Sequence, residues 1–269
     1  MVRPGIEKGM AEQTFTPPTD FDWLKTQPFA HRGLHGPGVV ENSWKAFDLA
    51  IAQGHGIELD VQCTNDGDVV VFHDETLDRL TDEQGRVAQI SSKKLQQIPI
   101  RGTGETISSL SETLHHIAGR VPVLIEIKGG AYGEDPAMLC LAVRRALEGY
   151  CGSVAIMSFS PMVVRWFRLM APNITRGLVV GNIKTLPYKG VFAGVFEKFL
   201  KRIHFDSLSS VWMARPHFLA MDVRILPTRL SKTMRKRHIP VLTWTVNSAE
   251  TWKVAKLHAD NVIYEQFDA

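Results

Sequence analysis

The sequence has few cysteines, no long apolar run and little excess of either charge. Its 269 residues include three cysteines, whose odd number and irregular spacing fit neither a disulfide framework nor a cysteine metal site. No apolar stretch reaches the roughly 18 residues that a membrane-spanning helix needs, and the N-terminal region lacks the apolar core of a signal peptide. A formal net charge of +3 gives no reason to expect nucleic acid as the main partner. We therefore expect a cytoplasmic globular protein.

Short β-branched and apolar runs alternate with helical patterns along the chain. Several of the runs are almost continuously apolar, as strands buried on both faces should be. Strand–helix alternation of this kind implies parallel strands joined by right-handed crossovers, and eight such units in about 250 residues are typical of a TIM (β/α)8 barrel. A doubly wound open sheet is the alternative. The predicted strands are 28–31, 56–62, 122–127, 153–158, 176–180, 217–222, 240–246 and 261–264.

A further run, 68–73, breaks the alternation, because too few residues separate it from strand 56–62 for a parallel crossover. It predicts an antiparallel hairpin. Asp66-Gly67 is a favoured pair for a two-residue turn, and such a turn would place Asp60 opposite His73.

Four segments describe the expected domain organisation. One barrel domain covers 28–269, after a lead-in of 1–27 that we expect to be partly disordered. Two insertions interrupt the barrel: a small cap-like segment, 74–104, and an extended loop or helix, 182–216.

Ionisable side chains gather where the predicted strands end, which is where the reacting groups of such a barrel lie. Three carboxylates from two strands would repel each other, and a hard divalent cation such as Mg²⁺ or Ca²⁺ would relieve that repulsion. Arginine and lysine beside a cation suit a phosphate ester, and two histidines can supply an acid and a base. The pattern therefore indicates metal-assisted phosphodiester cleavage. The side chains are His31, Arg32, Glu58, Asp60, His73, Glu126 and Lys128.

Together, in this order and spacing, the motifs resemble those of the glycerophosphodiester phosphodiesterase family. The motifs are His31-Arg32-Gly33, Glu41-Asn42, Glu58-x-Asp60, Asn65-Asp66-Gly67, Val70 to Asp74, Thr76 to Arg79 and Glu126-Ile127-Lys128. The resemblance implies a TIM barrel that hydrolyses a small-molecule glycerophosphodiester to sn-glycerol 3-phosphate and an alcohol. It also implies His31 and His73 as the acid–base pair, Glu58, Asp60 and Glu126 as ligands of Mg²⁺ or Ca²⁺, and Arg32 and Lys128 as phosphate contacts. It leaves open which histidine is the acid, and whether water or the glycerol hydroxyl attacks.

Other features bear on the substrate. Trp244 lies at a strand end and could line the glycerol pocket, whereas the chain ends its last strand with Ile263-Tyr264-Glu265, where family members often have a Thr/Asp-containing end. Residues 191–203 combine an apolar helical face with basic residues, which fits either a helix packed on the barrel or a peripheral membrane contact. The alternatives to the soluble-substrate enzyme are a membrane-associated lysophospholipase D or phospholipase-C-like enzyme, and a non-catalytic barrel that binds phosphoglycerol compounds. The sequence does not indicate the oligomeric state.

Overall fold

The computed structural model of the chain describes residues 20–128, 136–181 and 208–265. In these ranges the strands form one sheet in the order β1-β9-β8-β7-β6-β5-β4-β2-β3, which closes because β1 also pairs with β2. Every pairing is parallel except that of β3 with β2. The TIM barrel predicted from the sequence is therefore confirmed. The strands are β1 Phe29–His31, β2 Gly56–Cys63, β3 Val69–Val71, β4 Val123–Ile127, β5 Val154–Ser158, β6 Thr175–Val180, β7 Phe218–Asp222, β8 Val241–Val246 and β9 Asn261–Tyr264.

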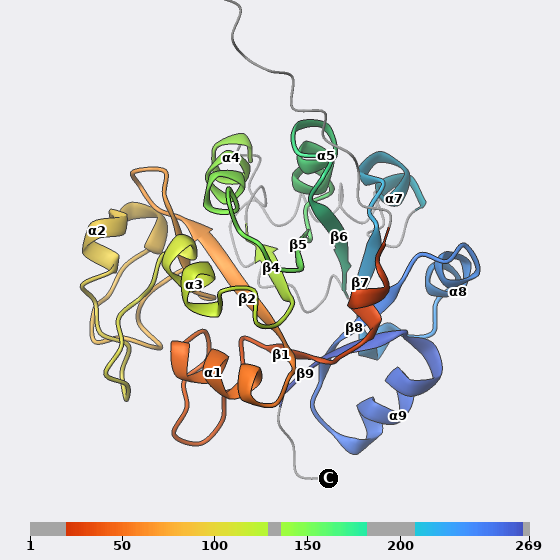
Figure 1. The fold of residues 1–269 in the computed structure, drawn as a ribbon, viewed down its shortest axis with the longest axis horizontal. Coiled ribbons are helices and arrows are strands. Elements are labelled where there is room, and N and C mark those ends of the chain that lie inside the picture. Colours follow the sequence, from red (N-terminus) through yellow and green to blue (C-terminus); the bar gives the residue numbers. More distant parts are fainter. Residues whose placement is uncertain (1–19, 129–135, 182–207, 266–269) are drawn as a thin grey trace, which may run out of the picture.

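Helices surround the barrel on the outside (Figure 1). The α-helices of the described residues are α1 Trp44–Ala52, α2 Ser92–Leu95, α3 Leu110–Ile117, α4 Ala137–Ala146, α5 Pro161–Met170, α7 Leu208–Ala214, α8 Arg229–Lys236 and α9 Ala249–His258. Short 3-10 helices are η1 Asp22–Lys25, η2 Val87–Gln89 and η4 Val223–Ile225. Ser43 caps the N-terminus of α1, since its hydroxyl accepts a hydrogen bond from the Ala46 N–H. None of the described helices is both long and apolar enough to cross a membrane.

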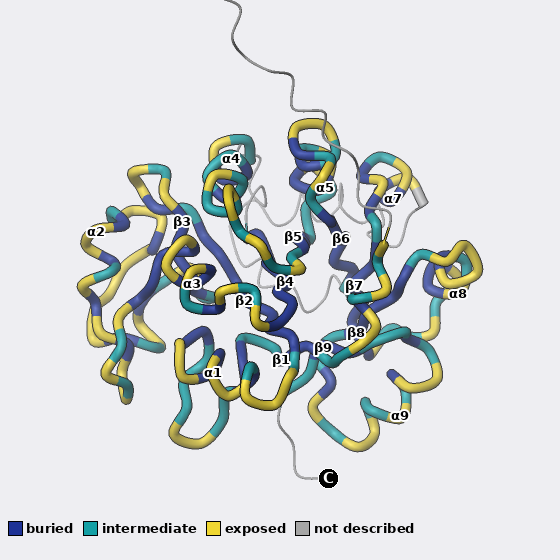
Figure 2. Tube along the Cα trace, viewed as in Figure 1, coloured by how far each residue is buried: buried dark blue, intermediate teal, exposed yellow. Residues whose placement is uncertain are grey.

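Side chains fill the inside of the barrel in layers. Near the N-terminal ends of the strands, the rings of Phe29 and Phe218 are fully buried and need glycine beside them. A Cβ on Gly56 would lie 2.5 Å from the Phe29 ring, and one on Gly177 would lie 2.3 Å from the Phe218 ring. Leu24 of η1 is buried in the same apolar cluster. Most of the strand residues are buried and dark blue in Figure 2, as expected of a solid core. Packed side chains thus close the N-terminal end of the barrel, so a functional site inside the barrel must lie at the C-terminal ends of the strands.

The hairpin between β2 and β3 forms as predicted, but its register differs by one residue. Val61 pairs with Val71 and Cys63 with Val69, so the predicted pairing of Asp60 with His73 is wrong. The reason is a three-residue turn: Gly67 N–H donates to Thr64 O at 3.1 Å, and Gly67 has a φ of +79°. A type I turn followed by a left-handed glycine adds one residue to the two-residue turn that we expected.

The cap-like insertion packs in a small apolar cluster, in which Leu77 and Leu95 of the insertion meet Phe72 at the end of the hairpin. It is also joined to the barrel, because the Glu105 carboxylate accepts hydrogen bonds from the first backbone N–H groups of α1, those of Trp44 and Lys45. Of the expected lead-in, residues 22–25 form η1 and 1–19 lie outside the described residues. Of the extended segment 182–216, only 208–216 is described, and it includes α7.

Candidate active site

Three carboxylates meet inside the barrel at the C-terminal ends of two adjacent strands. Glu58 and Asp60 lie two residues apart on β2 and therefore face the same way, and Asp60 pairs in register with Glu126 of β4. One carboxylate oxygen from each of the three lies within 4.8 Å of the others. Glu58 and Asp60 are almost fully buried, and Glu126 is 9% exposed. The sequence prediction that these three residues come together is therefore correct.

The surroundings of the two acids on β2 shift their pKa values in opposite directions. Burial, together with the charges of Asp60 and Glu126, raises the pKa of Glu58 well above its ordinary value. Burial also opposes ionisation of Asp60, but Lys128 and Arg32 outweigh it and hold the pKa of Asp60 far below its ordinary value. Without a cation, the surroundings of Glu58 thus oppose its ionisation, whereas those of Asp60 favour it.

Two basic side chains pair with these acids. Lys128 Nζ lies 3.0 Å from Asp60 Oδ1 and 2.8 Å from Glu126 Oε1. The Arg32 backbone N–H donates to Glu58 Oε2 at 3.1 Å, and Arg32 Nε lies 3.2 Å from Asp60 Oδ2 as an ion pair without hydrogen-bond geometry. Burial lowers the pKa of Lys128, yet Asp60 and Glu126 outweigh it and raise that pKa above its ordinary value. Both basic residues are therefore charged and lie beside the acids.

A divalent cation fits this donor set. The ligand atoms are all carboxylate oxygens, which Mg²⁺ and Ca²⁺ prefer. Glu58 Oε1 is buried and has no hydrogen-bond partner, which is costly for an oxygen unless a cation or a proton satisfies it. Lys128 bridges two of the three acids, so it already supplies one positive charge where a cation would supply two. Glu58, Asp60 and Glu126 are thus the residues that could hold the metal.

His31 lies beside the carboxylates at the end of β1. Its Nε2 is 3.9 Å from Glu58 Oε2, and its Nδ1 is 2.8 Å from Glu265 Oε1. The second contact was not expected from the sequence. A parallel register of β9 with β1 pairs Ala30 with Tyr264, which places Glu265 level with His31. Only the strand pairing could have revealed this contact.

His73 is held by a chain of ion pairs that starts in the insertion. Its Nδ1 lies 2.7 Å from Asp74 Oδ1, and Arg79 bridges Asp74 to Glu41 through several hydrogen bonds of 2.5–3.0 Å. Glu41 also accepts a hydrogen bond of 2.7 Å from Arg32 Nη1. The sequence motifs include Asp74, Glu41 and Arg79, but their mutual contacts become apparent only in the structure. His73 lies close enough to the acid cluster that a positive charge on its ring lowers the pKa of Asp60.

Trp244 lies on β8, which pairs with β7 and β9 and not with the strands that carry the three carboxylates. Its indole N–H donates to Ala220 O at 3.0 Å, and its ring packs edge-on against Phe159 at 5.6 Å between centroids. Since the polar end of the indole is used, Trp244 can offer only its apolar ring to a ligand.

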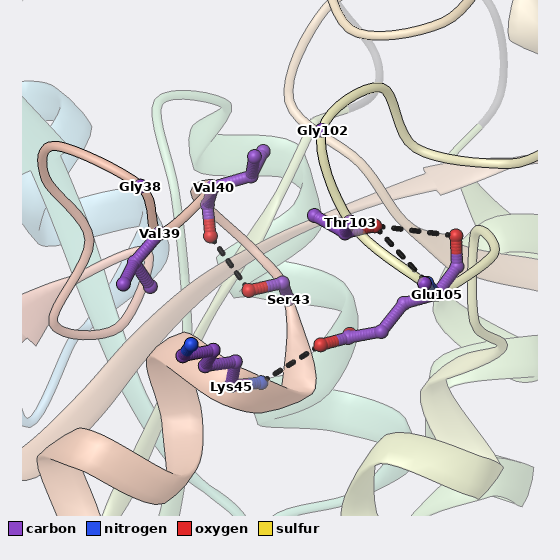
Figure 3. Close-up of a pocket in the computed structure, with 9 residues that line it drawn as sticks. Gly38, Val39, Val40, Ser43, Lys45, Gly102, Thr103 and Glu105 are labelled. Carbon is purple, nitrogen blue, oxygen red and sulfur yellow. Dashed lines mark hydrogen bonds between the residues drawn. The ribbon is translucent and has the colours of Figure 1, made fainter.

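A cavity of about 260 Å³ lies between the loop after β1 and the tip of the insertion (Figure 3). Gly38 to Val40 line one side, Thr103 to Glu105 the other, and Ser43 and Lys45 the base at α1. None of the three carboxylates lines it. The cavity is therefore distinct from the carboxylate cluster.

The comparisons with known proteins agree with this geometry. The model of the glycerophosphoryl diester phosphodiesterase family matches residues 31–269. The chain belongs to this family. As a member of the glycerophosphoryl diester phosphodiesterase family, it is a phosphoric diester hydrolase.

Individual members of the family resemble the chain over most of its length. A glycerophosphodiester phosphodiesterase of Caldanaerobacter subterraneus subsp. tengcongensis is 30% identical over 251 residues, which cover 89% of this chain and 94% of that protein. The crystal structure of a glycerophosphodiester phosphodiesterase from Agrobacterium tumefaciens superposes with a TM-score of 0.64 at 25% identity, over 90% and 96% of the two chains. An Oleispira antarctica phosphodiesterase in complex with the product sn-glycerol-3-phosphate shares the fold, with a TM-score of 0.71 at 21% identity over 90% and 93%.

Proposed function

We propose that the chain hydrolyses glycerophosphodiesters to sn-glycerol 3-phosphate and an alcohol, with a divalent cation at Glu58, Asp60 and Glu126 and with His31 and His73 as the acid–base pair. The observation that carries the proposal is the position of His31 Nε2, 3.9 Å from Glu58 Oε2 in the cluster of three buried carboxylates. Membership of the family supports the substrate class, and the product in the Oleispira relative is the product proposed here.

The basic residues bind and polarise the phosphodiester. Lys128 and Arg32 are charged and lie against Asp60, so a phosphate that enters the site meets two donors that are already oriented. Their charges offset the negative charge that develops on the phosphoryl oxygens in the transition state. When bound, Mg²⁺ or Ca²⁺ supplies further positive charge for the same purpose.

The histidines move the protons. One imidazole takes a proton from the attacking hydroxyl, which belongs either to water or to the substrate's own glycerol, and the other protonates the leaving alkoxide. Attack by water gives sn-glycerol 3-phosphate directly, whereas attack by the glycerol hydroxyl gives a cyclic phosphate that water then opens to the same product. Each imidazole has a carboxylate on Nδ1, Glu265 for His31 and Asp74 for His73, so in each ring the proton-transferring nitrogen is Nε2.

Trp244 is the candidate for the glycerol side of the substrate. Its ring packs with Phe159, and a Cβ on Gly181 would come within 3.2 Å of the Trp244 ring, so the ring has a fixed position at the end of β8. We assign it the apolar wall beside the glycerol carbons.

The proposal is tested by incubating the protein with glycerophosphocholine or glycerophosphoethanolamine, in the presence of Mg²⁺, Ca²⁺ or EDTA, and assaying released glycerol 3-phosphate. We expect turnover that EDTA abolishes and that His73→Ala lowers by about 10²–10⁴-fold, the usual contribution of one acid–base group. Trp212→Phe, on the exposed part of α7, is the control for handling and folding. Full activity in EDTA, or an unaffected His73→Ala enzyme, would contradict the mechanism. Vesicles that contain a lysophospholipid form a separate arm, and turnover there alone would favour the lipid-directed alternative.

A further inference from the structure

The residue that follows β9 lies beside an imidazole of the site. Backbone pairing fixes the position of Glu265: its N–H donates to Val246 O at 3.0 Å, and the preceding pairs join Ile263 to Phe29 and Tyr264 to Ala30. The carboxylate is half-buried, with 31% of the side chain exposed. The Glu265 carboxylate therefore reaches His31 from a backbone position that strand pairing holds in place.

Two imidazoles lie near the same oxygen of this carboxylate. His31 Nδ1 lies 2.8 Å from Glu265 Oε1, and His35 Nε2 lies 3.8 Å from the same oxygen. Only the first distance is that of a hydrogen bond. That hydrogen bond lowers the pKa of Glu265, so the carboxylate is ionised and acts as the acceptor. Glu265 thus interacts chiefly with His31.

The hydrogen bond decides which ring nitrogen of His31 faces the reaction. With the proton on Nδ1 donated to Glu265, the neutral ring carries its lone pair on Nε2, and Nε2 is the nitrogen that points toward Glu58. A carboxylate on Nδ1 also stabilises the imidazolium that forms when Nε2 takes a proton. Neither effect requires Glu265 to touch the substrate.

We propose that Glu265 is the positioning residue of His31: it holds the ring in one orientation and one tautomer so that Nε2 serves as the proton-transferring atom. The proposal rests on the proposed function. It also gives a role to the chain's departure from the family pattern at the end of the last strand, since a glutamate at this position reaches His31 Nδ1.

An alternative interpretation of this cluster is a metal site, because His31, His35 and Glu265 each offer a ligand atom within 4.8 Å of the others. The positioning role fits better, since the contact between His31 and Glu265 is already closed at hydrogen-bond length. The two interpretations differ in whether His35 is required: a metal site needs His35 as a ligand, whereas a carboxylate that positions His31 does not.

The test is a double-mutant cycle between Glu265 and His31. We expect Glu265→Ala to lower kcat by about 10–10³-fold with KM changed by less than about threefold, because the group acts on proton transfer and not on binding. Glu265→Asp should recover most of the rate, and Glu265→Gln should recover little because it lacks the charge. In a His31→Ala background, Glu265→Ala should have almost no further effect.

The controls separate the possible failures. We expect the activity of His35→Gln to stay within about threefold of the wild-type activity. If His35→Gln instead loses as much activity as Glu265→Ala, and if the wild type binds Zn²⁺ that both variants fail to bind, the three residues form a metal site and the positioning role is refuted. Additive losses in the His31→Ala background would reduce Glu265 to a structural role. An inactive wild type would refute the proposed function itself, whereas an active wild type with a fully active Glu265→Ala variant would refute only this inference.

Discussion

Replacing Lys128 with methionine should make metal binding and catalysis change in opposite directions. Lys128 Nζ lies 2.8–3.0 Å from oxygens of Glu126 and Asp60, two of the three candidate ligands. A cation that uses those oxygens must share them with an ammonium group. Two unit charges about 4 Å apart interact by about 4 kcal/mol at an effective dielectric constant of 20, and a divalent ion doubles that figure before solvent screens it. Methionine keeps an unbranched side chain that is one atom shorter and removes the repulsion.

We expect Lys128→Met to bind Mg²⁺ or Ca²⁺ about 10–100-fold more tightly than the wild type, which corresponds to roughly 1.4–2.7 kcal/mol. The same change should lower kcat by about 10²-fold, because the phosphoryl oxygens lose one oriented positive charge. Isothermal titration with the metal and the glycerol 3-phosphate assay measure the two effects on the same preparation.

Stability provides a third measurement. Removing one partner of a buried ion pair leaves charge uncompensated, and since the Lys128 side chain is 24% exposed we expect a loss of about 2–3 kcal/mol without metal. At about 2–4 °C per kcal/mol for a domain of this size, Tm should fall by roughly 4–12 °C in EDTA, and saturating metal should restore more of it than the metal adds to the wild type. If Lys128→Met instead binds the cation more weakly than the wild type, the competition for Asp60 and Glu126 does not exist and the assigned ligand set is wrong.

Three further predictions follow from the electrostatics of the site. Because the folded pKa of Glu58 is raised, this group binds more protons in the metal-free folded protein than in the unfolded chain, so its contribution to the unfolding free energy should fall as pH rises from about 4.5 toward that folded pKa, by up to about 1.4 kcal/mol per pH unit. In EDTA, the Tm of the wild type should therefore fall relative to that of Glu58→Gln over this pH range. Metal affinity should show the opposite trend and rise with pH, because binding releases that proton. Arg79→Lys should lower kcat by about tenfold while Tm changes by only a few degrees, since lysine cannot bridge Asp74 and Glu41 with paired donors; equal kcat in the two proteins would show that the bridge does not position His73.

Strand positions and the acid cluster could be predicted from the sequence because they depend on local pattern. Continuous apolar runs mark strands covered on both faces, and a spacing of two residues puts Glu58 and Asp60 on one side of β2. The eight predicted barrel strands all form, with ends that differ by at most one residue. Because the two strands are parallel neighbours, their C-terminal ends lie side by side, and this order brings Asp60 and Glu126 together.

Contacts that depend on exact register or on side-chain reach could not be predicted. The pairing of Asp60 with His73 was wrong because the turn at Gly67 holds one more residue than its dipeptide suggests. Glu265 was regarded only as a departure from a family pattern, since 234 residues separate it from His31 in the chain and only the closure of the barrel joins them. Residues 191–203, for which a membrane contact was considered, lie outside the described residues, so that hypothesis stays a prediction.

The two imidazoles are held in the same way by unrelated parts of the chain. Glu265 fixes His31 from the last strand of the barrel, and Asp74 fixes His73 from the start of the insertion. The second anchor does not stand alone, because Arg79 ties Asp74 to Glu41. Since Glu41 also accepts from Arg32, which pairs with Asp60, a movement of the insertion would pass through ion pairs to the acid cluster. In the proposed mechanism, moving the insertion would therefore disturb proton transfer by His73 and phosphate binding by Arg32 together, and the contacts of the insertion with the barrel would contribute to the chemistry as well as to the fold.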